Sequence, residues 1–244
     1  HRRERAAMIL LAFETSAKAA STAVLQDETL LGETYLNCGL THSRTLMQAA
    51  QQLLENCGLS AKDVTAVACA AGPGSFTGVR IGVAAAKGFA WGAELPCVGV
   101  STLEAMAYSA QCFEGVICCA MDARRQQVYN ALFSCSGGNL VRLTPDRAVS
   151  LAELEEDLKK IEKPKIIVGD GAELCYNTIG NKGFGCILAP EQSRMQRASG
   201  VARLARTMLL QGAEGDGAAL VPNYLRLSQA ERERAERLRA TEGV

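Results

Sequence analysis

Hydrophobic and polar residues change their spacing several times along this chain of 244 residues. Near the start, short apolar runs alternate with brief polar links, which predicts an antiparallel meander of three strands. These runs cover residues 8–15, 21–26 and 30–37. From Ser43 the apolar residues recur every three or four positions as far as Cys57, which predicts an amphipathic helix that ends at Gly58.

The next segments alternate between strands and helices. A flat apolar run at 64–70 predicts a buried parallel strand, and a helix is expected at 77–91. A strand at 96–100 and a short helix at 102–109 follow. Three strands, helix, strand, helix, strand and helix is the element order of the ribonuclease-H-like unit found in actin-like proteins.

The second half of the chain begins to repeat this order. Strands are expected at 115–121, 126–134, 140–143 and 165–168, and helices at 151–160 and 172–179. We therefore predict an α/β, two-lobed actin-like (ASKHA, ribonuclease-H-like) fold with a degenerate second lobe. A last helix at 199–211 has the apolar spacing to pack back on the first lobe.

These patterns divide the chain into parts. We expect the first lobe at 8–108, the second lobe at 109–195, and a segment at 196–226 that packs back on the first lobe. Residues 1–7 and 227–244 are interpreted as terminal extensions, and both are rich in arginine.

Composition narrows the class of protein. The 26 basic residues balance the 26 acidic ones, so no net charge draws the chain toward nucleic acid or a membrane. No apolar run reaches the roughly 18 residues that a membrane helix needs. The ten cysteines are scattered through apolar segments without a C-x-x-C pair, so we expect free thiols and a cytoplasmic location.

Histidine limits the chemistry that the chain can perform. Beyond His1, the sequence contains only His42, so a Ser-His-Asp or Cys-His pair could be built on that residue alone. His42 sits where a helix begins, which is typical of a helix-start or surface residue. We expect no metal site and no catalytic residue.

Two segments could contact a phosphate group. FETS at 13–16 ends the first strand with an acid and hydroxyls, although it could instead form the turn into the next strand. GPGSFTGVRIG at 72–82 begins with a rigid turn whose backbone amides could face an anion, with Thr77 capping the helix. It is not a Walker P-loop, and a purely structural turn is the alternative. The candidate phosphate contacts are Glu14, Ser16, Gly72, Gly74 and Thr77.

Glycine recurs inside the helix that follows this turn. A glycine in a helix costs about 1 kcal/mol relative to alanine, so these positions need a compensating contact. We expect another helix to come close at Gly78, Gly82 and Ala86. It could belong to the same chain, as the helix at 43–57 does, or to another subunit.

Several of these segments together resemble one family. ILLAFETSAKAASTAVL, THSRTLMQAAQQLL, GPGSFTGVRIGVAAAKGFA and DARRQQVYNALF are similar to the TsaB (YeaZ) family of the bacterial tRNA threonylcarbamoyladenosine machinery. The resemblance covers roughly residues 8 to 226, including VPNYLR. The chain departs from it at Glu14, where many members have aspartate, and in the arginine-rich tail after residue 227.

The resemblance implies a subunit without chemistry of its own. It would bind and support a TsaD-type catalytic paralogue, with two helices of each protein forming a four-helix bundle and a TsaE-type ATPase docking at the junction. The assembly would transfer a threonylcarbamoyl group to the adenosine next to the anticodon, so tRNA would be met through the complex. The family also implies a homodimer when alone, no tightly bound cofactor, and ATP or ADP at the complex interface.

The resemblance also implies residue roles. TsaD carries a metal-binding histidine pair after the strand that reads PCVGV here, and residues 101–106 contain no histidine. Arg80 is singled out because a guanidinium near a subunit junction could reach a carboxylate or a nucleotide phosphate. The expected partner-interface residues are Ser43, Leu46, Met47, Ala50, Leu54, Val79, Arg80, Val83, Ala86, Lys87 and Ala90.

Two other functions remain open. An actin-like small-molecule kinase or peptidase would need acidic residues, for which Asp122 and Asp170 are the available extras, although both fit turns or loops. A self-sufficient homodimer could instead bind nucleic acid through the arginine-rich tail at 228–244.

Overall fold

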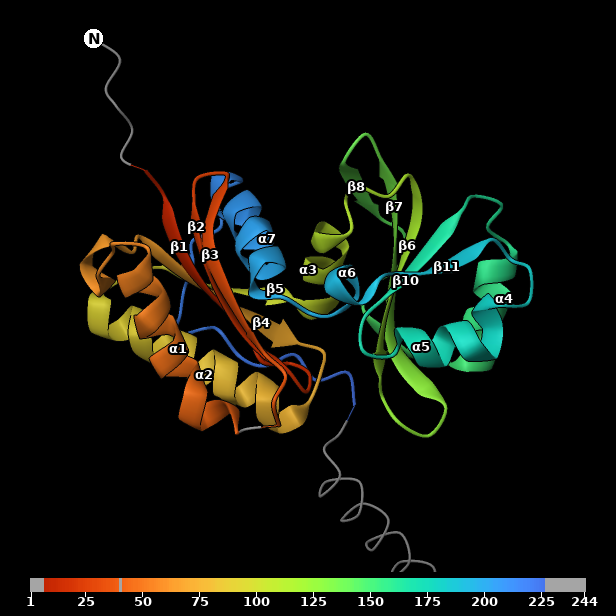
Figure 1. Cartoon of the computed structure of the whole chain (residues 1–244), viewed down its shortest axis with the longest axis horizontal. Coiled ribbons are helices and arrows are strands. Elements are labelled where there is room, and N and C mark those ends of the chain that lie inside the picture. Colours follow the sequence, from red (N-terminus) through yellow and green to blue (C-terminus); the bar gives the residue numbers. More distant parts are fainter. Residues whose placement is uncertain (1–6, 40, 227–244) are drawn as a thin grey trace, which may run out of the picture.

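The computed structural model describes residues 7–39 and 41–226, which form two lobes with a sheet in each (Figure 1). In the first lobe the strand order is β3-β2-β1-β4-β5. β1 pairs antiparallel with β2 and parallel with β4. The strands are β1 (Ile9–Glu14), β2 (Ala20–Gln26), β3 (Thr29–Leu36), β4 (Ala66–Gly72) and β5 (Cys97–Ser101).

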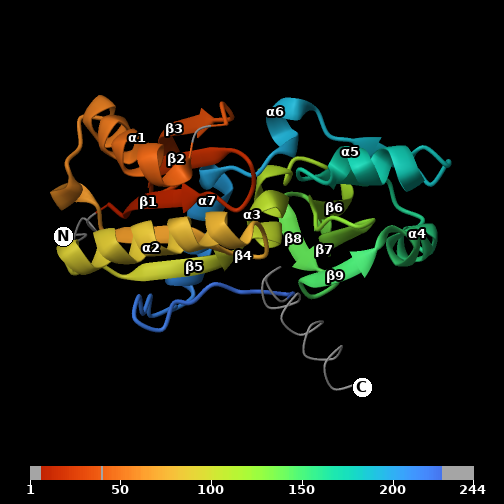
Figure 2. The same ribbon diagram turned by 90° about the horizontal axis from the view of Figure 1, so that it is seen from below.

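Helices cover both faces of the first sheet because the side chains of β1 alternate between its two faces. Leu11 and Phe13 pack under α1 (His42–Asn56) and α2 (Phe76–Ala93), which lie side by side (Figures 1 and 2). Leu10 packs with α7 (Ala198–Leu210) on the opposite face. The last helix, α7, therefore lies against the first sheet.

The second lobe is built on a sheet with the order β11-β10-β6-β7-β8, and β9 pairs with β7. Its strands are β6 (Gly115–Asp122), β7 (Gln127–Ser136), β8 (Asn139–Arg142), β9 (Arg147–Ser150), β10 (Lys165–Val168) and β11 (Cys186–Leu188). β9 and β11 were not predicted, because strands of three or four residues are too short to show a period. The remaining elements are η1 (Ala61–Asp63), α3 (Thr102–Ser109), α4 (Leu151–Lys159), α5 (Ala172–Cys175), the π-helix η2 (Tyr176–Gly180) and α6 (Glu191–Arg194).

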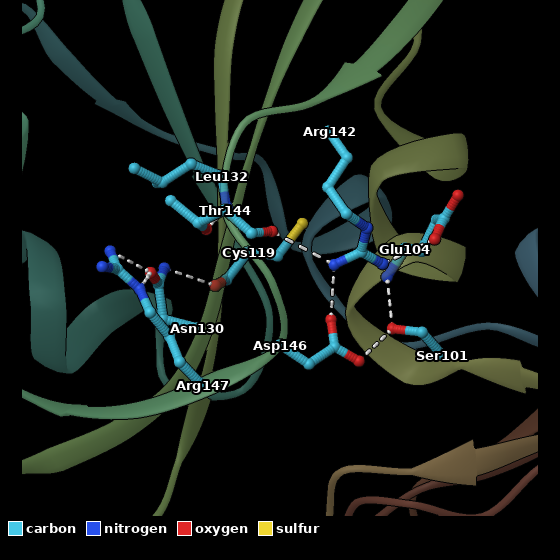
Figure 3. Close-up of polar contacts among 9 residues, drawn as sticks. All are labelled: Ser101, Glu104, Cys119, Asn130, Leu132, Arg142, Thr144, Asp146 and Arg147. Atoms are coloured by element: carbon cyan, nitrogen blue, oxygen red, sulfur yellow. Dashed lines mark hydrogen bonds and ion pairs between the residues drawn. The ribbon is translucent and has the colours of Figure 1, made fainter.

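Charged side chains tie the two lobes together beside α3 (Figure 3). The Ser101 hydroxyl, at the end of β5, donates to the Asp146 carboxylate at 2.6 Å. Arg142, at the end of β8, pairs with Asp146 at 2.7 Å and with Glu104 of α3 at 2.5 Å. We call these four residues the interlobe brace.

The glycines of α2 are explained by a contact within the chain. A side chain at Gly78 would collide with the carbonyl oxygen of Thr15, which follows β1. A Cβ at Gly82 would lie 2.5 Å from the Thr15 hydroxyl, which donates to the Gly78 carbonyl at 2.7 Å. Ala86 is fully buried in the same lobe. At Gly78 and Gly82 the expected approach of another helix or subunit is wrong, because Thr15 at the end of β1 already occupies that space. Ala86 lies in the core cluster that α2 shares with α1.

The start of α2 also differs from the prediction. Ser75, not Thr77, is the N-cap, and its hydroxyl accepts a hydrogen bond from the Gly78 N–H at 3.3 Å. Thr77 lies inside the first turn with an exposed side chain. The expected terminal extensions at 1–7 and 227–244 lie outside the described residues, apart from residue 7.

Replacing a glycine of α2 by alanine should change the free energy of unfolding in opposite directions at two positions. We predict that Gly78→Ala lowers the free energy of unfolding by about 1–3 kcal/mol, because the new methyl group meets backbone that cannot move aside. Gly88→Ala should raise it by about 0.5–1 kcal/mol, because that exposed position has open space around it. Urea denaturation measures both, and an equal effect at the two positions would contradict the packing described here.

Candidate functional site

A cleft of about 960 Å³ lies between the lobes. Residues 16–18, after β1, and 73–78, at the start of α2, form its first-lobe wall. Residues 122–124 and Asp170 line it from the second lobe, and residues 223–226 border it as well. Its volume is at the upper end of the range for small-molecule sites.

Glu14 lies beneath this cleft at the end of β1. Its side chain is only 2% exposed, and one carboxylate oxygen accepts a hydrogen bond from the Ser16 N–H at 2.6 Å. Burial raises the pKa of Glu14 from 4.5 to about 7, against the smaller lowering effect of the polar groups of Ser16 next to it. Asp170, across the cleft, adds a further small increase.

Ser16 takes part in the local hydrogen bonding through its backbone but not through its hydroxyl. Its carbonyl accepts from the Ser75 N–H at 2.7 Å, which fixes the loop before α2 against the end of β1. Its hydroxyl is buried and has no hydrogen-bond partner among the described residues. Gly74 is needed at this contact, because a Cβ there would lie 2.5 Å from the Ser16 carbonyl oxygen.

The five candidate phosphate contacts therefore separate into two groups. Ser16, Gly74 and Thr77 line the cleft together. Glu14 is buried behind the lining, and Gly72 is covered by Asn223, whose carbonyl oxygen would collide with any side chain at Gly72. Gly72 has a φ of 116°, so it also requires glycine for its backbone conformation.

Three other polar residues of the cleft have hydrogen-bond partners in the chain. His42 Nε2 lies 3.0 Å from the Ala17 carbonyl oxygen. Asp122 accepts a hydrogen bond from the Arg124 N–H at 2.7 Å, and Asp170 accepts one from Gln196 at 2.8 Å. Within residues 7–39 and 41–226, no group of three or more His, Cys, Asp or Glu side chains is placed to hold a metal ion.

The predicted interface residues lie on different sides of α1 and α2. Ser43 is exposed and the Met47 side chain is 43% exposed. Arg80 and Lys87 contact the C-terminal segment (residues 212–226), through Tyr224 and two backbone carbonyls respectively. The seven buried in the core of the first lobe are Leu46, Ala50, Leu54, Val79, Val83, Ala86 and Ala90.

Another face of α2 is exposed to solvent, and the sequence analysis did not predict it. Ala84, Gly88 and Trp91 follow one another at helical spacing and are exposed, with Trp91 87% exposed. We call these three residues the outward face of α2. The available signal was the single tryptophan, which stands at helical spacing from small residues and outside the buried stripe.

Comparison with known proteins places the chain in a family. A family model described as TsaD, tRNA N6-adenosine threonylcarbamoyltransferase, matches residues 37–233. The tRNA threonylcarbamoyladenosine biosynthesis protein TsaB of Bacillus subtilis (strain 168) is 36% identical over 228 residues, 92% of this chain and 96% of that protein. The protein of the same name from Escherichia coli (strain K12) is 33% identical, over 90% and 95% of the two chains. This chain belongs to the TsaB family.

Solved structures agree with this assignment at the level of the fold. YeaZ from Pseudomonas aeruginosa matches this structure with a TM-score of 0.75 and 24% sequence identity, over 89% of this chain and 100% of that one. The predicted resemblance to the TsaB (YeaZ) family and the predicted actin-like fold are both confirmed. None of the helices in the described part of the chain is long and apolar enough to cross a membrane.

The raised pKa of Glu14 predicts a pH dependence of stability. The folded state holds this proton to about pH 7 and the unfolded chain releases it near 4.5, so stability should fall as the pH rises through this window. Relative to Glu14→Gln, the wild-type free energy of unfolding should fall by about 3 kcal/mol between pH 4 and 8.

Denaturant titrations at several pH values measure this difference. Glu162→Gln, at an exposed position of the second lobe, is the matched control and should follow the wild-type curve. Parallel curves for wild type and Glu14→Gln across the whole range would show that Glu14 titrates normally.

Proposed function

We propose that this chain is a non-catalytic partner subunit in the formation of tRNA threonylcarbamoyladenosine. It would bind and support a TsaD-type catalytic paralogue that modifies the adenosine next to the anticodon. Membership of the TsaB family supports the pathway, because the relatives carry that biosynthetic name. The observation that carries the partner role is the outward face of α2.

The geometry of this face suits a helix of another protein. Ala84 and Gly88 are one helical turn apart, and small side chains allow two helix backbones to approach closely. Trp91 adds a large exposed aromatic side chain of the kind that dominates binding energy at interfaces. Met47 on the adjacent helix α1 is a further exposed apolar side chain. A partner pair of helices would complete a four-helix bundle with α1 and α2.

This proposal revises which of the expected interface residues would meet the partner. Ser43 and Met47 are accessible for direct contact. The seven buried residues would support the helices from below. Arg80 and Lys87 would act at the edge of the interface, where they hold the C-terminal segment.

The other proposed partners rest on the family resemblance. A TsaE-type ATPase would dock at the junction of the two subunits, with ATP or ADP bound there, and tRNA would be met through the complex in the cytoplasm. Without its partner, the chain would cover the same apolar face with a second copy, as a homodimer. A catalytic role has less support, because beyond its first residue the sequence offers only His42 as the histidine of a Ser-His-Asp or Cys-His pair.

A phosphate group in the cleft is a separate proposal, favoured by the unused Ser16 hydroxyl and by the start of α2 beside it. Calorimetric titration of ATP into the isolated chain tests it. A heat of binding that is lost in Ser16→Ala supports it, and no heat with the wild-type chain contradicts it.

A larger polar side chain on the outward face should weaken partner binding without harming the fold. We predict that Gly88→Gln raises the dissociation constant for the TsaD-type partner by at least about tenfold, because it blocks close helix approach. Calorimetric titration of the partner, with and without ATP, measures this change.

Ala152→Gln, on the exposed side of α4 in the second lobe, is the matched control. It should bind like the wild type. If wild type, Gly88→Gln and Ala152→Gln bound the partner with equal affinity, the outward face of α2 would not be part of the interface. No binding by the wild-type chain, with or without ATP, would refute the proposed function.

A further inference from the structure

The C-terminal segment is held firmly against the first lobe. The Cys97 N–H donates to the Gly215 carbonyl at 2.8 Å, and Lys87 Nζ donates to the Leu220 carbonyl at 2.9 Å. Leu220 packs in the space above Gly99, where any side chain would collide with it. In Figure 2 this segment runs below β5 toward the second lobe.

The end of this segment packs against the start of α2. The Asn223 N–H donates to the Ala71 carbonyl at 2.6 Å. The Tyr224 ring stacks on Phe76 with a centroid distance of 4.2 Å, and its hydroxyl accepts a hydrogen bond from Arg80 Nε at 2.8 Å. The Arg80 guanidinium lies 4.0 Å from the Phe76 ring centroid and 5.7 Å from the Tyr224 ring centroid, so the three side chains form one cluster.

The next contact crosses to the second lobe. Arg226 Nη1 donates to the Ala123 carbonyl at 2.8 Å, in the loop between β6 and β7. Arg124, Arg125 and Gln126 of that loop have φ values of 62°, 55° and 57°. Non-glycine residues disfavour this left-handed conformation, so hydrogen bonds within the loop and contacts from outside it together hold its shape.

We propose that residues 220–226 form a latch that joins the lobes across the mouth of the cleft. The interlobe brace connects the lobes beside α3, and the latch connects them where residues 223–226 border the cleft. A change in lobe separation at the mouth must break the Arg226–Ala123 hydrogen bond or lift Tyr224 from Phe76. The latch therefore fixes both the width of the cleft and the shape of the loop at 122–127.

The latch also reaches the proposed docking surface. Arg80 holds Tyr224 from α2, whose outward face begins one helical turn further along at Ala84. A partner that engages Arg80 would change its hold on Tyr224 and so transmit docking to the cleft. This step alone rests on the proposed function.

Hydrogen exchange of the isolated protein tests the latch. Amides of the loop at 122–127 include two that donate to backbone carbonyls within it, from Ala123 and Gln127. We expect Arg226→Ala to speed exchange in this loop by about three- to tenfold, as the loss of one partly exposed hydrogen bond implies. Tyr224→Ala should also speed exchange in this loop, although Tyr224 contacts α2 and not the loop itself.

Arg80→Ala is the milder second variant, because it releases Tyr224 without removing its ring. Arg206→Ala, which breaks an ion pair with Glu28 inside the first lobe, is the matched control and should leave the loop unchanged. Unchanged loop exchange in Arg226→Ala, or in both Tyr224→Ala and Arg80→Ala, would overturn the latch.

The same measurement with the TsaD-type partner separates the two proposals. Partner binding should change loop exchange in the wild type and less so in Arg226→Ala. Partner binding with no change in the loop would overturn the link from α2 to the cleft. An absence of binding would refute the proposed function while the latch, measured in the isolated chain, still stands.

Discussion

The close fit of Thr15 against the glycine face of α2 determines much of the rest of this structure. The Thr15 hydroxyl donates to the Gly78 carbonyl, and neither Gly78 nor Gly82 has room for a side chain. This contact brings the end of β1 and the start of α2 together as one wall of the cleft. It also decides which side of α2 is buried, and so which side faces solvent with Ala84, Gly88 and Trp91.

Two consequences follow at the cleft. The turn after β1 is covered by α2, so Glu14 loses contact with water and its pKa rises to about 7. The Ser16 hydroxyl is buried without a partner among the described residues, beside the first turn of α2. The fold thus keeps the outline of a ligand site, while Asn223 and Tyr224 of the same chain cover part of its border.

Local patterns in the sequence were enough for most of the architecture. The expected strands and helices of the first lobe match the structure within a few residues, because its helices bury one periodic apolar face and its central strands are continuous apolar runs. β9 and β11 were missed because edge strands of three or four residues have too few positions to show a period. The family was recognisable because its motifs lie in these same well-patterned segments.

The candidate site was less accessible to such reasoning. Gly72 reads as a phosphate-loop glycine, yet the residue that comes closest to it is Asn223, from the far end of the chain. The spacing of small residues in α2 shows that a close approach exists, but not whether Thr15 or another protein makes it. Arg80 looks like a free surface cation until Tyr224 is placed beside it. Each of these contacts is long-range, so no local pattern encodes it.

Trp91 offers the most direct measurement of the central claim, that α2 turns its outward face to a partner protein. It is the single tryptophan of the chain and is 87% exposed. A chain labelled with fluorotryptophan should give one fluorine resonance from this residue. On adding the TsaD-type partner, we expect that resonance to shift and to lose its sensitivity to the exchange of water for heavy water. Saturating binding with Trp91 still fully solvent-exposed would contradict the account.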